Sequence, residues 1–148
     1  MNYSEEVPVR MVLKGARRQL NYNVKELGED ELKALWEKEG SETPYDYFAK
    51  EHKYSYCSLE MGGARWNYNG IVEAIIREKY TNDQMEAITN NMNVVVAEFF
   101  NTLVTDGLGE SITYLLTSVK SDNMANFKAM QEWRALAKRE ARDVLNMY

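Results

Sequence analysis

Apolar residues recur at three- and four-residue steps through most of this chain, which is the spacing of amphipathic helices. The clearest case is the C-terminal segment that follows Ser121. Its apolar positions are Met124, Phe127, Met130, Trp133, Ala137, Ala141, Val144 and Tyr148. The pattern predicts a long helix capped by Ser121, whose apolar face needs a partner.

The same spacing predicts shorter helices in the rest of the chain. The predicted segments are 9–20, 29–39, 44–52, 70–79, 82–92, 94–105 and 112–119. Gly40 ends the second segment, and Thr43 caps the third with Pro44 at its first helical position. Thr81 and Gln84 form a capping box for the fifth. The Asn-rich residues 89–93 are a candidate interruption, so that 82–105 forms either one helix or two, and residues 106–109, DGLG, are a helix stop and turn.

One stretch alternates between apolar and polar residues instead. It is YSYCSLEMGGARWNY, residues 54–68, with Gly62 and Gly63 at its centre. A two-residue turn at these glycines would place Cys57, Leu59, Met61, Ala64, Trp66 and Tyr68 on one face of a hairpin. A phosphate-binding loop would need more widely spaced glycines, usually with Lys-Ser/Thr and a helix start. The stretch therefore predicts a half-buried β-hairpin.

These elements predict a single-domain, mainly α-helical α+β fold, with five to seven helices packed with one β-hairpin that turns at Gly62-Gly63. Only two prolines occur, and no linker, low-complexity run or repeat marks a domain boundary. The residues expected in or near the core are Trp36, Leu59, Trp66, Ile71, Ile75, Phe99, Phe100, Leu115, Phe127 and Trp133.

The composition excludes several classes of protein. Of 148 residues, 45% are apolar and 28% charged, which is ordinary for a globular protein. No apolar run approaches the ~20 residues of a membrane span, so no membrane partner is expected. The polar N-terminus does not resemble a secretory signal, which predicts a location inside a cell. With one cysteine and one histidine, neither a disulfide nor a zinc site is expected, and no cofactor is predicted.

The charges are unevenly distributed around a net charge of −5. Both ends of the chain are basic and the middle is acidic. Two sets of basic residues recur at helical spacing: Arg10, Lys14, Arg17 and Arg18, and then Arg134, Lys138 and Arg142. On helices, each set would share one face and favour an anion, which could be nucleic acid, an acidic protein or the acidic middle of this chain. The alternative is a solvated face, and the net charge disfavours nucleic acid.

Two further side chains have chemistry that a catalytic site could use. His52 has an unperturbed pKa near neutrality, but it lies at the end of a short helix with no Ser or Cys nucleophile in a suitable local context. Cys57 is expected to project from the apolar face of the hairpin as a small hydrophobic residue. The sequence therefore predicts no catalytic residues and no enzymatic activity.

Two motifs resemble small proteins encoded by tailed bacteriophages and prophages of gut Bacteroidales. They are WNYNGIVEAIIREKYTNDQMEAITNN, residues 66–91, and FKAMQEWRALAKREARDVL, residues 127–145. No catalytic residues accompany that resemblance. It implies a small virion, assembly or host-interaction protein, located in the bacterial host cytoplasm or in a virion. The abundant Tyr and Met, typical of adaptable interfaces, agree with such a role. We expect a structural or protein-interaction module that binds a protein partner or self-associates, with a nucleic-acid-binding regulator as the alternative.

Overall fold

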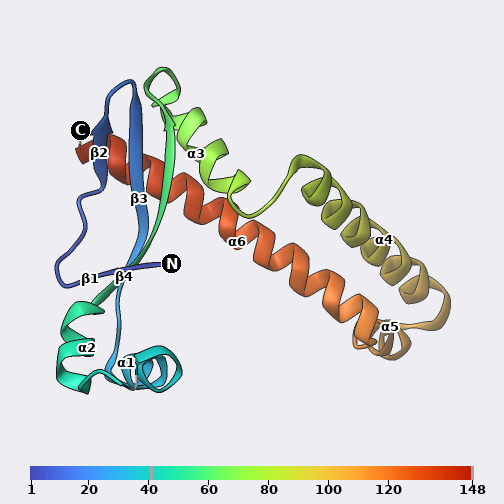
Figure 1. The fold of residues 1–148 in the computed structure, drawn as a ribbon. Coiled ribbons are helices and arrows are strands. Elements are labelled where there is room, and N and C mark those ends of the chain that lie inside the picture. Colours follow the sequence, from blue (N-terminus) through green and yellow to red (C-terminus); the bar gives the residue numbers. More distant parts are fainter. Residues whose placement is uncertain (41, 148) are drawn as a thin grey trace. The chain divides into compact units, whose positions relative to one another are not determined.

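A computed structural model describes residues 1–40 and 42–147 of the chain. These residues form a mainly α-helical α+β fold, as predicted, with six α-helices and a four-stranded antiparallel sheet (Figure 1). They group into two compact units. The sheet unit is Met1–Ala74 together with the chain from Lys138 on, and the helical unit is Ile75–Ala137. The expected single domain stays a prediction. Tyr148, expected on the apolar face of the last helix, lies outside the described residues.

The sheet has the strand order β1-β4-β3-β2. Its strands are β1 (Asn2–Ser4), β2 (Met11–Lys14), β3 (Arg17–Glu26) and β4 (Tyr54–Gly62). A bulge interrupts β3 between Tyr22 and Lys25, where Asn23 adopts a positive φ of 54°. Asn tolerates this conformation better than most residues, which lets the strand bend and then resume its pairing.

The helix predicted for residues 9–20 is wrong, because these residues form β2, a turn and the start of β3. Lys14 lies opposite Arg17, so Gly15 and Ala16 make a two-residue hairpin turn. Gly15 has φ 63°, the positive value that such turns need at their first position. Gly15, which weakened the helical pattern, is therefore the residue that reverses the chain.

The hairpin predicted at Gly62-Gly63 is also wrong, although the strand before it exists. The partners of β4 are β3 and β1, and residues 63–65 form a 3₁₀ turn, η2 (Gly63–Arg65). Leu59 lies opposite Leu20, which brings two buried side chains together. The predicted alternation holds, since Leu59 and Met61 are buried and Cys57 is half-buried.

Three short helical segments and α3 complete the sheet unit from residue 29 to residue 74. They are α1 (Glu29–Leu35), the π-helical turn η1 (Trp36–Gly40), α2 (Tyr45–Glu51) and α3 (Tyr68–Arg77). Helical structure ends at Gly40, as predicted. The predicted Thr43 cap is wrong, because Pro44 occupies the N-cap of α2 and no side chain caps that helix. The buried core of this unit includes Leu20, Tyr22, Phe48, Leu59, Met61, Ile71, Ala141 and Val144.

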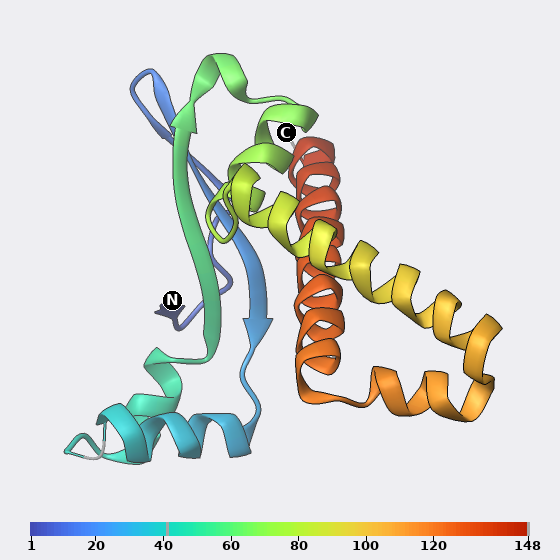
Figure 2. The same cartoon turned by 90° about the vertical axis from the view of Figure 1, so that its right-hand side faces the viewer.

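The helical unit contains α4 (Asn82–Asp106), α5 (Leu108–Leu115) and most of α6 (Ser118–Met147), with α5 joining the ends of the two long helices (Figure 2). The Thr81–Gln84 capping box is present as predicted. The Asn-rich stretch does not interrupt α4. α4 ends at Asp106, and its C-cap Gly107 has φ 90°. α6 begins at Ser118, three residues before the predicted cap Ser121.

The core prediction is correct for part of its list. Leu59, Ile71 and Ile75 are buried, whereas Phe100 is 58% exposed and was wrongly placed. The other six, all half-buried, are Trp36, Trp66, Phe99, Leu115, Phe127 and Trp133. In the described part of the chain no helix is both long and apolar enough to cross a bilayer.

Candidate interaction surfaces

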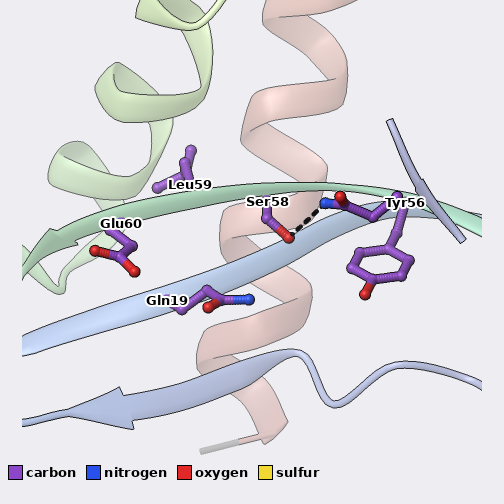
Figure 3. A pocket seen from close by; sticks show the side chains of 6 residues that line it. Gln19, Tyr56, Ser58, Leu59 and Glu60 are labelled. Atoms are coloured by element: carbon purple, nitrogen blue, oxygen red, sulfur yellow. Dashed lines mark hydrogen bonds between the residues drawn. The ribbon is translucent and has the colours of Figure 1, made fainter. Parts of the chain in front are cut away.

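The outer face of the sheet carries a hydrogen-bonded polar network centred on Asn21, which is only 4% exposed. The side-chain amide nitrogen of Asn21 donates to the Val9 carbonyl at 2.6 Å. Its Oδ1 accepts from the Gln19 side chain at 2.9 Å and from the Ser58 hydroxyl at 2.7 Å. Asn2 donates to the Ser58 hydroxyl at 3.1 Å (Figure 3). Gln19, Ser58, Asn2, Tyr56, Leu59 and Glu60 line a depression of about 320 Å³ here. Within the network these side chains satisfy one another's hydrogen-bonding groups. Their hydrogen bonds link β1, β3, β4 and the segment before β2.

Arg10 connects this network to the last helix. Its Nε donates to the Asn21 carbonyl at 2.8 Å, and its guanidinium also pairs with Glu140 of α6. Both side chains of the pair are largely shielded from water, at 16% and 10% exposure. Because so little water surrounds this charge-assisted contact, it holds the C-terminal turns of α6 to the sheet.

The predicted N-terminal basic set does not lie on one helical face. Lys14 contacts Glu60 at 2.9 Å, and Arg17 approaches the same carboxylate at 3.9 Å. The hydrogen bond and charge of Lys14 lower the pKa of Glu60, with a smaller contribution from Arg17. Arg18 lies over the Trp66 ring at 5.4 Å. The anion that Lys14 and Arg17 contact is therefore Glu60, in the acidic middle of the chain. The sequence allowed this partner as well as nucleic acid or an acidic protein.

The second basic set does lie on a helix. Arg134, Lys138 and Arg142 follow one another at one-turn steps along α6. Arg134 is half-buried, and Lys138 and Arg142 are exposed. Whether they bind an anionic partner stays a prediction.

His52 and Cys57 occupy structural positions. His52 is the C-cap of α2; its ring stacks on Phe48 at 3.9 Å, and its Nδ1 lies 2.8 Å from the Phe48 carbonyl oxygen. Tyr3 contacts the same imidazole at 4.9 Å. Cys57 is half-buried opposite Tyr22. Among residues 1–40 and 42–147, no cluster of His, Cys, Asp and Glu could hold a metal ion.

The helical unit exposes two rows of apolar side chains, here called the apolar rows. One row, on α4, is Val96, Phe100 and Val104, and the other, on α5 and its C-cap, is Leu108, Ile112 and Leu116. Within each row the residues are four apart and share a helix face. Val104 is 85% exposed and Leu116 is 75% exposed. An accumulation of exposed apolar residues of this kind makes the apolar rows a candidate interaction surface.

The stretch of chain that carries the apolar rows has charges of one sign. No Lys or Arg occurs from Thr81 to Val119, whereas five acidic residues do: Asp83, Glu86, Glu98, Asp106 and Glu110. Glu98 accepts a hydrogen bond from the Tyr114 hydroxyl, which joins α4 to α5. Burial, and then the Glu98 contact, raise the pKa of Tyr114 to about 12. The charged residues of α4 and α5 are therefore all acidic, and the nearby cation Lys120 lies over the Tyr114 ring at 5.2 Å.

The sequence contained a signal for the apolar rows that the core prediction did not use. Met85, Ile88, Met92, Val95 and Phe99 account for the inward face of α4, with Val95 2% exposed. α4 has three more apolar residues, Val96, Phe100 and Val104, which do not fit on this inward face of the helix. No comparable signal marked Asn21, because two of its partners, Val9 and Ser58, come from other segments of the chain.

Comparisons with protein-family models, with curated proteins and with solved structures find no match to this chain.

Proposed function

We propose that this protein is a non-enzymatic structural or protein-interaction module that binds its partner through the apolar rows of α4 and α5. The observation that carries this proposal is the exposure of both rows, since water contact with Phe100, Val104 and Leu116 is unfavourable until a partner covers them. Full burial of side chains of this size contributes roughly 1.5–3 kcal/mol each to the free energy of binding. The loss of translational and rotational freedom on association offsets part of this gain.

The surrounding charge supports a partner of a particular kind. Because the charged residues of α4 and α5 are all acidic, an apolar surface whose rim is neutral or basic would match the apolar rows best. The exposed basic residues of α6, Lys138 and Arg142, are of that sign, so another copy of the chain is one suitable partner. The resemblance to phage-encoded proteins favours an assembly or host-interaction role for such a contact.

Nucleic-acid binding is the alternative, and the structure gives it less support than the sequence did. Arg10, Lys14 and Arg17 contact carboxylates of the same chain, which leaves Arg134, Lys138 and Arg142 to supply the phosphate contacts. Binding of this kind would weaken steeply with salt, and replacing these three residues with Ala would remove it.

The proposal is tested by the solution mass of the protein at low and moderate salt, together with the binding of a hydrophobic dye. We expect either an oligomer at both salts or a monomer that binds the dye, because apolar contacts resist salt. Val104→Lys with Leu116→Lys should reduce the oligomer or the dye signal. A monomer that binds no dye, unchanged in the double variant, would contradict the proposal.

A further inference from the structure

The chain contains two pairs in which Asn or Asp is followed by glycine, Asn69-Gly70 and Asp106-Gly107. In such pairs the glycine nitrogen can attack the side-chain carbonyl carbon of the residue before it and close a succinimide ring. Glycine favours this reaction because it has no side chain to hinder the approach and its backbone is conformationally permissive. The reaction needs a glycine nitrogen that is not engaged in a hydrogen bond and a side chain that can turn toward it. The fold therefore determines which of the two pairs reacts.

The Asn69-Gly70 pair is protected by the first turn of α3. The Gly70 N–H donates to the Asn67 side-chain oxygen at 2.9 Å, so its nitrogen is engaged. Gly70 is also buried, with the Arg65 carbonyl packed where a side chain would otherwise stand. Ring closure at Asn69 would require this turn to open first.

The Asp106-Gly107 pair lies at the open junction of α4 and α5 (Figure 2). Asp106 ends α4, and Gly107 is the one residue between the two helices. Among residues 1–40 and 42–147, no acceptor receives the Gly107 N–H, and the exposed Asp106 side chain makes no hydrogen bond or ion pair. The Gly107 carbonyl, by contrast, accepts from the Ser111 amide at 3.2 Å and from the Ser111 hydroxyl at 2.9 Å. The junction is therefore ordered while its reactive nitrogen stays free.

We propose that Asp106 converts spontaneously to isoaspartate in the folded protein, whereas Asn69 is protected by its turn. The Gly107 nitrogen bonds to Cγ of Asp106, and its proton leaves with the carboxyl hydroxyl group as water. A water molecule then adds to the backbone carbonyl carbon of Asp106 and breaks the bond between that carbon and the Gly107 nitrogen. The water released and the water consumed balance, so the reaction needs no cofactor and no oxidant. The backbone afterwards runs through Cβ and Cγ of Asp106.

The modification would lie between the apolar rows. Val104 ends the row on α4 and Leu108 begins the row on α5, and isoaspartate places one more backbone atom between them. A modified chain would therefore present the two rows to a partner with a longer connection. This inference is independent of the proposed function, because ring closure requires no partner.

The test is incubation at neutral pH in water enriched in the heavy isotope of oxygen. Each ring that opens leaves one heavy oxygen on the reacting residue, which fragment mass spectrometry locates after digestion in ordinary water. The measured quantity is the labelling rate of each residue in the folded protein relative to its rate in guanidinium chloride. We expect folding to lower the rate at Asn69 about tenfold or more, because the Gly70 N–H must first leave its hydrogen bond. Folding should leave the rate at Asp106 almost unchanged.

Two variants control the measurement. Asp106→Glu keeps the charge, but its longer side chain closes a larger ring only slowly, so labelling at this position should be lost. Asn67→Ala removes the acceptor of the Gly70 N–H, which should raise the rate at Asn69 in the folded protein severalfold and leave the rate at Asp106 unchanged. Equal protection of Asn69 and Asp106 by folding, or greater protection of Asp106, would overturn the proposal. So would labelled Asp106 that an isoaspartate-specific methyltransferase does not modify.

Discussion

At the scale of single residues, the side chain of Asn21 makes three hydrogen bonds that a substitution would remove. Replacing it with Leu keeps the side-chain volume but deprives Val9 of a donor and Gln19 and Ser58 of an acceptor. We expect a loss of about 1–3 kcal/mol in the free energy of unfolding, measured by urea denaturation. Gln19→Leu is the control, since Gln19 gives one bond to the network. Equal losses for the two variants would show that Asn21 is not the centre of the network.

The ion pair of Lys14 with Glu60 makes a prediction about pH. A carboxyl whose pKa is lowered on folding stabilises the fold above its ordinary pKa, and this contribution is lost as the pH falls through the lowered value. In Lys14→Met, the pKa of Glu60 should rise towards its ordinary value in an NMR titration of the carboxyl groups. Lys50→Met, which removes the partner of Glu5, should leave the pKa of Glu60 unchanged.

These residue-level contacts were mostly hidden from the sequence. The Thr81–Gln84 box was predictable because both partners lie within one turn. The bonds of Asn21 to Ser58 and of Arg10 to Glu140 span 37 and 130 residues. Only the sheet register and the placement of α6 bring those partners together, and neither can be read from local spacing.

At the scale of elements, the sequence predicted long helices well and short strands poorly. The helices α3, α4 and α6 repeat one apolar spacing over several turns, so their existence was clear and only their ends were misplaced. β2 has four residues, too few to distinguish strand alternation from helical spacing. The strand β4 was recognised, but its partner was placed next in the sequence. The true partners are β1 and β3, and the residues of β3 lie 28 to 45 positions before those of β4 with which they pair.

The start of α3 depends on one glycine. The Asn67 side chain accepts from the Gly70 amide at 2.9 Å, as an N-cap does, and this folds Arg65 back over the first turn. A Cβ on Gly70 would lie 1.9 Å from the Arg65 carbonyl oxygen. The backbone on both sides is fixed by the turn η2 and the helix, so the overlap cannot be relieved by a side-chain rotation.

We therefore expect Gly70→Ala to destabilise the protein by more than the ~1–3 kcal/mol typical of an overpacked site. Gly109→Ala is the matched control within α5, because a Cβ added to Gly109 would meet no atom within 4 Å. It should stabilise the helix by about 0.4–1 kcal/mol. Thermal unfolding followed by circular dichroism would measure both. Similar melting temperatures for the two variants would mean that Arg65 can move away.

At the scale of the whole molecule, two helices belong to both compact units. α3 passes from the sheet unit into the helical unit between Ala74 and Ile75, and α6 returns between Ala137 and Lys138. Within the helical unit, the Trp133 indole donates to the Ile75 carbonyl at 3.0 Å, and Lys79 lies 4.5 Å from the Trp133 ring centre. These contacts tie the end of α3 to α6, while the apolar rows of α4 and α5 stay exposed.

The absence of Lys and Arg from residues 81–119, which carry the apolar rows, also determines which reagents can examine them. Trypsin cuts after Lys or Arg, so it has no site from Thr81 to Val119, and amine-directed cross-linkers find no lysine there. Chymotrypsin, which cuts after large apolar residues, has Phe100 and Leu116 as targets. We expect a partner seated on the apolar rows to protect these two sites from chymotrypsin while tryptic cleavage at Lys138 and Arg142 continues.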